Sequence, residues 1–161
     1  MEPRIETIPE KQLIGKHISM TLVNNQTRAL WQSFMPRRKE IQNNISSDLI
    51  SMQVYSQALD YNTFTPEVSF EKWAAIEVAD FNNVPEGMET FLLPAGLYAV
   101  FHYKGTVSEF APTWHYIFGI WLPASGYIID NRPHFEVLGE KYKNESPDSE
   151  EEIWIPIKSA L

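Results

Sequence analysis

Apolar and polar residues alternate over several short stretches of the chain, and this two-residue period predicts β-strands. The expected strands are residues 12–22, 50–56, 70–78, 97–103, 127–129, 134–139 and 152–157. Bulky residues at helical spacing predict two helices, one reaching residue 34 after a cap at Thr27 and one over residues 109–121. Pro36 and Pro123 are expected to end these helices.

The order strand, helix, strand, strand occurs twice, and this repetition predicts an α+β fold of two related halves. The halves are expected at about residues 1–94 and 95–161, within one domain that spans residues 1–161. A shift of 79 positions places the strand 73–78 over 152–157. With pseudo-two-fold symmetry, antiparallel sheets from both halves would surround a central ligand cleft. The residues expected to lie under the helices are Ala74, Ile76, Val78, Ile153, Ile155 and Ile157.

Composition narrows the classes of function. A formal net charge of -8 and a pI near 5.0 argue against direct binding to the phosphate backbone of nucleic acids. The chain has no cysteine, its four histidines lack metal-ligand spacing, and no glycine-rich phosphate loop is present, so we expect no metal and no cofactor. No segment is typical of a signal peptide or a membrane span, which predicts a cytoplasmic protein with no membrane partner.

Glu152 and Trp154 are the strongest candidates for a binding site, since they lie two residues apart on the same face of the last strand. A carboxylate beside an indole can hold a cation by charge and by a cation–π contact. If desolvated, the same carboxylate could act as a general base. A solvated glutamate that continues the run from Glu150 is the alternative on spacing alone. Glu77 has a weaker form of the same pattern, and Tyr55 lies in a strand from which its ring could face the cleft.

Three segments together resemble the GyrI-like family, whose effector-binding domains also follow the DNA-binding modules of AraC- and MerR-type transcription regulators. The segments are Gly119–Tyr127, Arg132–Glu136 and Glu151–Ile157. The resemblance implies two similar α+β halves around a cleft that binds lipophilic, cationic compounds. It also implies that the cleft glutamate is the one before the apolar-aromatic-apolar-proline run, which is Glu152 here. The aromatic residues implied as cleft walls are Tyr55, Trp73, Trp121 and Trp154.

We therefore expect a stand-alone effector-binding protein, without a helix-turn-helix module, that binds lipophilic aromatic cations in the cleft. One alternative is a hydrolase of electrophilic xenobiotics that uses the same glutamate as its general base. The other is a protein-interaction role of the gyrase-inhibitor kind, for which the charged loop 141–151 offers an acidic surface. The expected partner is a small molecule, with a protein partner in the third case only.

Overall fold

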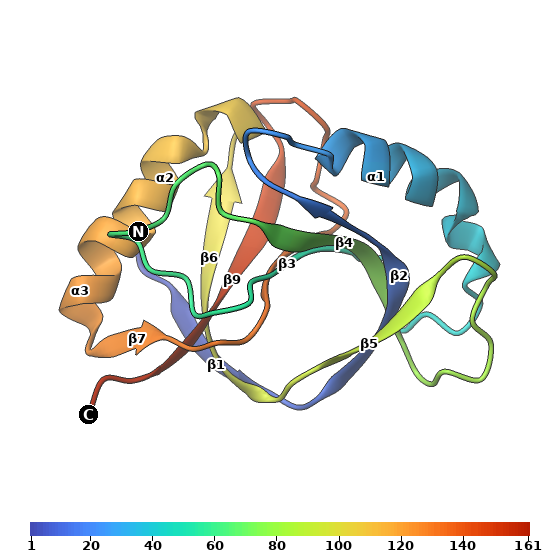
Figure 1. Cartoon of the computed structure of the whole chain (residues 1–161), viewed down its shortest axis with the longest axis horizontal. Helices are drawn as coiled ribbons and strands as arrows, with labels where there is room; N and C mark the ends of the chain where they lie inside the picture. The colour runs from blue at the N-terminus through green and yellow to red at the C-terminus, as the bar shows by residue number, and fades with distance from the viewer.

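The structure, a computed structural model, describes residues 1–161 and has the predicted α+β architecture. Figure 1 shows a strongly curled sheet with helices on its outer side. The strands are β1 (Arg4–Ile8), β2 (Lys11–Met20), β3 (Leu49–Val54), β4 (Phe70–Val78), β5 (Glu89–Leu93), β6 (Gly96–Lys104), β7 (Tyr127–Ile129), β8 (His134–Leu138) and β9 (Glu150–Ser159). The helices are α1 (Thr27–Phe34), α2 (Ala111–Tyr116) and α3 (Leu122–Ser125), with 3₁₀-helices at Met35–Glu40 and Val107–Glu109 and a π-helix at Ile117–Trp121.

Two strands, β1 and β5, were not expected from the sequence. Both lie at the edges of the sheet, and in each of them only the last residue, Ile8 or Leu93, is buried. A strand with one buried residue shows no alternation of apolar and polar positions, so the two-residue period cannot reveal it. The other strands lie where the pattern predicts them.

The helix ends differ from the expected ones. Thr27 is the first helical residue instead of the cap, and its N–H donates to Asn25 Oδ1 at 2.9 Å. Pro123 does not end the second helix: the π-helix at Ile117–Trp121 continues without a break into α3, and Pro123 lies in the first turn of α3. The helix ends instead at Gly126, whose φ of 82° is in the left-handed region. None of the helices has the length and hydrophobicity of a membrane-spanning segment.

All strand pairs are antiparallel, and the order across the sheet is β1-β6-β9-β8-β3-β4-β2-β5, with β7 paired to β9. Exchanging β1 with β5, β2 with β6, β3 with β8 and β4 with β9 gives the same order read from the opposite edge. His17 and His102 have matching partners, Glu71 at 2.7 Å and Glu150 at 2.8 Å. This topology is the one that a duplication would produce, while the division near residue 94 stays a prediction.

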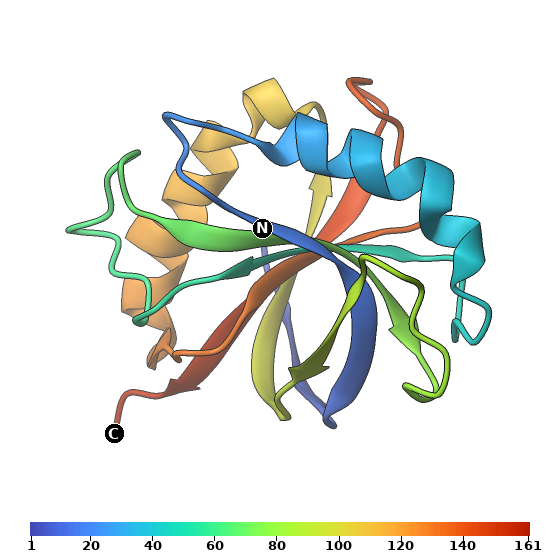
Figure 2. The same ribbon diagram turned by 45° about the vertical axis from the view of Figure 1, so that its right-hand side comes forward.

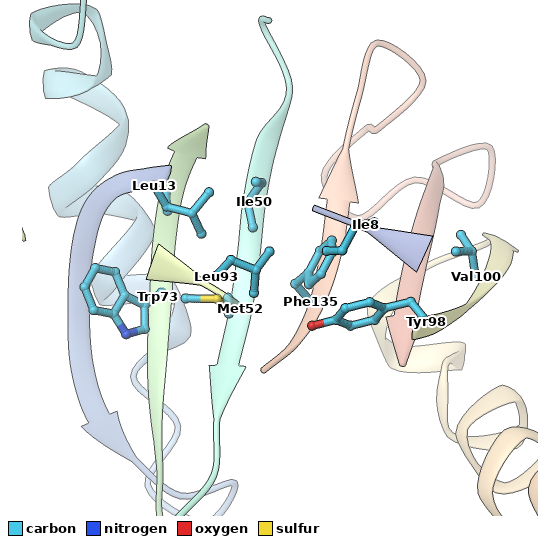
Figure 3. Close-up of a cluster of buried hydrophobic side chains, with 10 residues drawn as sticks. Ile8, Leu13, Ile50, Met52, Trp73, Leu93, Tyr98, Val100 and Phe135 are labelled. Carbon is cyan, nitrogen blue, oxygen red and sulfur yellow. The ribbon is translucent and has the colours of Figure 1, made fainter. Parts of the chain in front are cut away.

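The inner face of the curled sheet is a packed core. Ten buried residues from both halves form it, and Figure 3 shows them as sticks, with labels on Trp73, Tyr98 and Phe135 among others. Tyr98 is fully buried, and its hydroxyl donates to the Pro133 carbonyl at 2.8 Å. Sequence reasoning placed Trp73 on the wall of an open central cleft, but its surroundings on this face are filled with side chains.

The outer face is covered by the helices (Figure 2). Leu30 and Phe34 of α1 pack on one half of the sheet, and Ile117 and Phe118 pack on the other half. The residues beneath them are Ala74, Ile76, Val78, Ile153, Ile155 and Ile157, as predicted. Alternation therefore assigned the two faces of β4 and β9 correctly.

Gly15 allows a close approach between β2 and β4. A Cβ at this position would lie 2.1 Å from the Ala74 carbonyl oxygen and 2.7 Å from the Ala75 Cα, and backbone atoms cannot move aside as a flexible side chain can. We expect Gly15→Ala to lower the free energy of unfolding by about 2–3 kcal/mol, measured by urea denaturation. Gly139→Ala, which meets only the Asp48 side chain, is the control, and equal effects of both changes would contradict this account.

Candidate functional site

Strand β9 presents Glu152 and Trp154 on the inner side of the sheet, next to the packed core. Trp154 stacks on Phe135 with ring centroids 5.2 Å apart and an interplanar angle of 15°. Its Nε1–H donates to Glu152 Oε1 at 3.3 Å. The core thus fixes the indole, and the indole in turn orients the carboxylate.

Arg4 of β1 places a cation in this site. Its Nη2 donates to Glu152 Oε2 at 2.8 Å, and its guanidinium carbon lies 5.6 Å from the centroid of the Trp154 ring. A second ion pair joins Arg4 Nε to Glu6 at 3.3 Å. The carboxylate and the indole therefore contact a positive charge in the way that their spacing predicts, and the charge comes from the chain itself.

Glu152 also borders a hollow of about 420 Å³ at the end of the sheet, which we call the acidic hollow. Its lining contains one apolar side chain, Val137, and one lysine, Lys141. The residues that bring carboxylates to it are Asp48, Glu140, Glu150, Glu151 and Glu152. This concentration of negative charge favours a cationic occupant.

Glu151 points to the other face of β9, toward a buried polar cluster. Lys72 of β4 is only 6% exposed, and its Nζ lies 3.8 Å from Glu136 Oε1. Gln53 Nε2 donates to the same oxygen at 2.9 Å. Desolvation, together with repulsion by Glu136, raises the pKa of Glu151 to about 7, although Lys72 acts in the opposite direction. Burial likewise lowers the pKa of Lys72.

Aromatic rings flank this polar cluster on the helix side. Tyr55 contacts Phe70 and His134, with ring centroids 5.2 Å and 5.3 Å apart. Burial, with the nearby charge of Arg132, lowers the pKa of His134 to about 3, so this imidazole is neutral at physiological pH. Tyr55 therefore lies across the sheet from Glu152 and does not share its site.

The remaining predicted site residues lie apart from Glu152. Trp73 is 5% exposed and stacks on His17 with centroids 4.4 Å apart. Glu77 forms an ion pair with Lys11 at 3.3 Å, in the other half of the sheet. Trp121 lines a separate hollow beside α3. The structure thus joins Trp154 with Glu152 and leaves the other four elsewhere, and their roles in ligand binding stay predictions.

Four residues that contribute to these sites were missed by sequence reasoning. Arg4 reaches Glu152 from 148 residues away, and no local pattern reports such a contact. Lys72 and Glu136 come together only because β3 lies between β4 and β8. Glu151 could have been found, because alternation puts it on the same face as Ile153 and therefore under the helix layer. No group of three or more His, Asp or Glu side chains is arranged to hold a metal ion.

Residues 1–158 match the GyrI-like small molecule binding domain, which covers nearly the whole chain. The chain belongs to the GyrI-like family. Among its relatives, the transcriptional regulator BrlR of Pseudomonas aeruginosa is 28% identical over 158 residues, which are 98% of this chain and 56% of BrlR. A DNA gyrase inhibitor of Erwinia billingiae is 33% identical over 78 residues, 47% of this chain and 48% of that protein. The chain thus matches about half the length of each relative.

Solved structures agree with the GyrI-like fold. SAV2435, solved with bound tetraphenylphosphonium, superposes with a TM-score of 0.74 at 14% identity, covering 98% of this chain and 94% of that one. A hydrolase from Listeria innocua gives a TM-score of 0.60 at 12% identity, covering 98% and 92%. At these identities the likeness establishes the fold alone, and the GyrI-like family assignment establishes a small-molecule-binding domain.

The raised pKa of Glu151 links stability to pH. In the folded state Glu151 keeps its proton up to a pH of about 7, whereas in the unfolded chain it loses this proton near pH 4.5. The free energy of unfolding therefore falls as the pH rises from about 4.5 to about 7 and does not change further above pH 7. We expect Glu151→Gln to stabilise the protein at pH 8 by on the order of 1–2 kcal/mol, since partial exposure screens part of the shift. At pH 4 the two proteins should unfold alike in thermal denaturation. A gain of the same size at both pH values would contradict the assignment.

Proposed function

We propose that this chain binds lipophilic aromatic cations, with Glu152 as the charged anchor and Trp154 as the aromatic contact. The observation that carries this proposal is the position of the Arg4 guanidinium, 2.8 Å from the carboxylate and over the indole. A site that holds an arginine in this manner has the chemistry for another delocalised cation. The acidic hollow beside Glu152 supplies further negative charge and space for a ligand.

The contact that an incoming cation must replace is weak. Arg4 and Glu152 have side chains that are 49% and 34% exposed, and ion pairs of this exposure contribute about 0–1 kcal/mol. A lipophilic cation adds the burial of its own apolar surface, which arginine lacks, at about 25 cal/mol per Å². Tetraphenylphosphonium, the ligand of the structurally similar SAV2435, is a cation of this kind and is the natural probe.

The first test compares two adjacent glutamates. We expect Glu152→Gln to weaken tetraphenylphosphonium binding about tenfold, because the nearest negative charge is lost, as measured by isothermal titration calorimetry. Glu151→Gln is the comparison: Glu151 borders the same hollow but leaves the opposite face of β9, so its substitution should raise the dissociation constant less than Glu152→Gln does. An unchanged constant for Glu152→Gln would refute the role of this residue. Weakening by Glu151→Gln alone would transfer the role to Glu151 and its buried cluster.

The second test removes the internal cation. We expect Arg4→Gln to strengthen tetraphenylphosphonium binding about threefold, because the ligand no longer competes with a guanidinium for Glu152. Lys158→Gln controls for the general effect of one lost positive charge, since Lys158 is exposed and lies near Asp130 instead. The competition is absent if both variants bind equally well, or if Arg4→Gln binds more weakly than the unmodified protein.

A second candidate function is the hydrolysis of electrophilic xenobiotics. This function is favoured by Glu151, which borders the acidic hollow. Its side-chain pKa of about 7 suits a general base at neutral pH. In this case a small electrophile, such as an activated cyclopropane, disappears at a hundredfold excess over protein. The rate should rise with pH through about 7 as the carboxylate loses its proton, and Glu151→Gln should abolish it. Loss of one equivalent per chain, without turnover, would leave only binding.

A further inference from the structure

A second hollow, of about 430 Å³, lies on the other side of the α2–α3 segment from the polar cluster, and we call it the aromatic hollow. It is formed where β1 passes the segment that runs from α2 through the π-helix to α3 and β7, on the left of Figure 1. Six of its nine lining residues are hydrophobic. Those used below are Ile5, Tyr116, Ile120, Trp121 and Tyr127.

Contacts with residues outside the hollow fix the positions of its aromatic rings. Trp121 packs edge-on against the buried Phe101 with centroids 5.2 Å apart, and it lies nearly parallel to Tyr127 at 6.4 Å. Tyr116 donates its hydroxyl hydrogen to the Met1 carbonyl at 2.9 Å, which joins the helix to the segment before β1. A rigid aromatic wall loses little conformational entropy when it contacts a ligand.

The π-helix explains why apolar side chains remain uncovered here. Its wider turn, at Ile117–Trp121, buries Ile117 and Phe118 against the sheet while Ile120 stays 63% exposed. Ile5 of β1 lines the same hollow and is 40% exposed. Single π-helical turns inside α-helices are frequently found at functional sites. These two exposed isoleucines line the same hollow, and exposed apolar patches of this kind mark ligand-binding grooves.

We propose that the aromatic hollow is a second binding site, for flat aromatic small molecules that are neutral or carry one positive charge. Its volume lies within the range of about 300–1,000 Å³ typical of small-molecule sites. The one charged residue in its lining is Glu2, which accommodates a single positive charge and disfavours an anion. A flat ring system can stack on Trp121 and Tyr127, whose ring planes are nearly parallel.

The two sites are separate but share β1. Arg4 and Ile5 are neighbours in this strand and point to opposite faces of the sheet, so Arg4 contacts Glu152 while Ile5 lines the aromatic hollow. Ile5 is opposite Ala99, which packs under the helix segment, and Arg4 is opposite Val100 in the inner core. A ligand in the aromatic hollow therefore does not contact Glu152.

The test uses acridine orange, a flat cationic dye, titrated into the full chain while the Ile δ1-methyl NMR signals are recorded. We expect the signals of Ile5 and Ile120 to shift and those of Ile45 to stay. Ile120→Lys should raise the dissociation constant of the responding site about tenfold, by blocking the hollow and repelling the dye. Ile128→Lys is the matched control, because Ile128 is 45% exposed on β7 and does not line the hollow.

Glu152→Gln separates this proposal from the previous one. It should leave the Ile5 and Ile120 shifts and their dissociation constant unchanged, even if it abolishes tetraphenylphosphonium binding. The proposal is overturned if the two methyl signals do not respond to the dye, or if Ile120→Lys and Ile128→Lys have equal effects. It is also overturned if ultracentrifugation shows that Ile120→Lys converts a dimer into a monomer, since a second copy would then cover the hollow.

Discussion

The close packing of the inner sheet face is the constraint on which the rest of the structure depends. Ten buried residues from both halves fill the space that the curled sheet encloses. The two hollows therefore lie outside this packed face, at the end of the sheet and beside the helices. The same packing makes the candidate site rigid, because Trp154 stacks on Phe135 of the core and holds Glu152 by a hydrogen bond.

The three consecutive glutamates at the start of β9 have different partners, because strand geometry sends successive side chains to opposite faces. Glu150 contacts His102 at 2.8 Å, and Glu152 contacts Arg4 at the same distance. Glu151 points the opposite way, toward Lys72 and Glu136, where desolvation dominates its titration. Ion-paired carboxylates and a carboxylate with a raised pKa thus occupy adjacent positions, because successive side chains of a strand leave opposite faces of the sheet.

The sequence predicts the faces of individual strands better than it predicts how the strands are arranged in the sheet. Alternation placed Ile153 under the helices and Trp154 on the inner face, and the family motif in β9 indicated the fold. Alternation could not show whether the face of Trp73 is open or filled, since that depends on the curvature of the whole sheet. It also could not supply Arg4, because the pairing of β1 with β6 is a long-range property that no short segment encodes.

The pairing of β1 with β6 has a consequence for how the chain reaches its native state. Strand β1 ends at Ile8, but its only partner, β6, begins at Gly96, and β5 in turn pairs only with β2 near the start of the chain. The second half therefore takes its edge strand, β1, from the first half, and β3 pairs with β8 across the two halves, so the protein should fold and unfold as one cooperative unit. During synthesis on the ribosome, more than half of the chain must be made before β6 is available to pair with β1. Until then the backbone hydrogen-bonding groups of β1 have no partner strand.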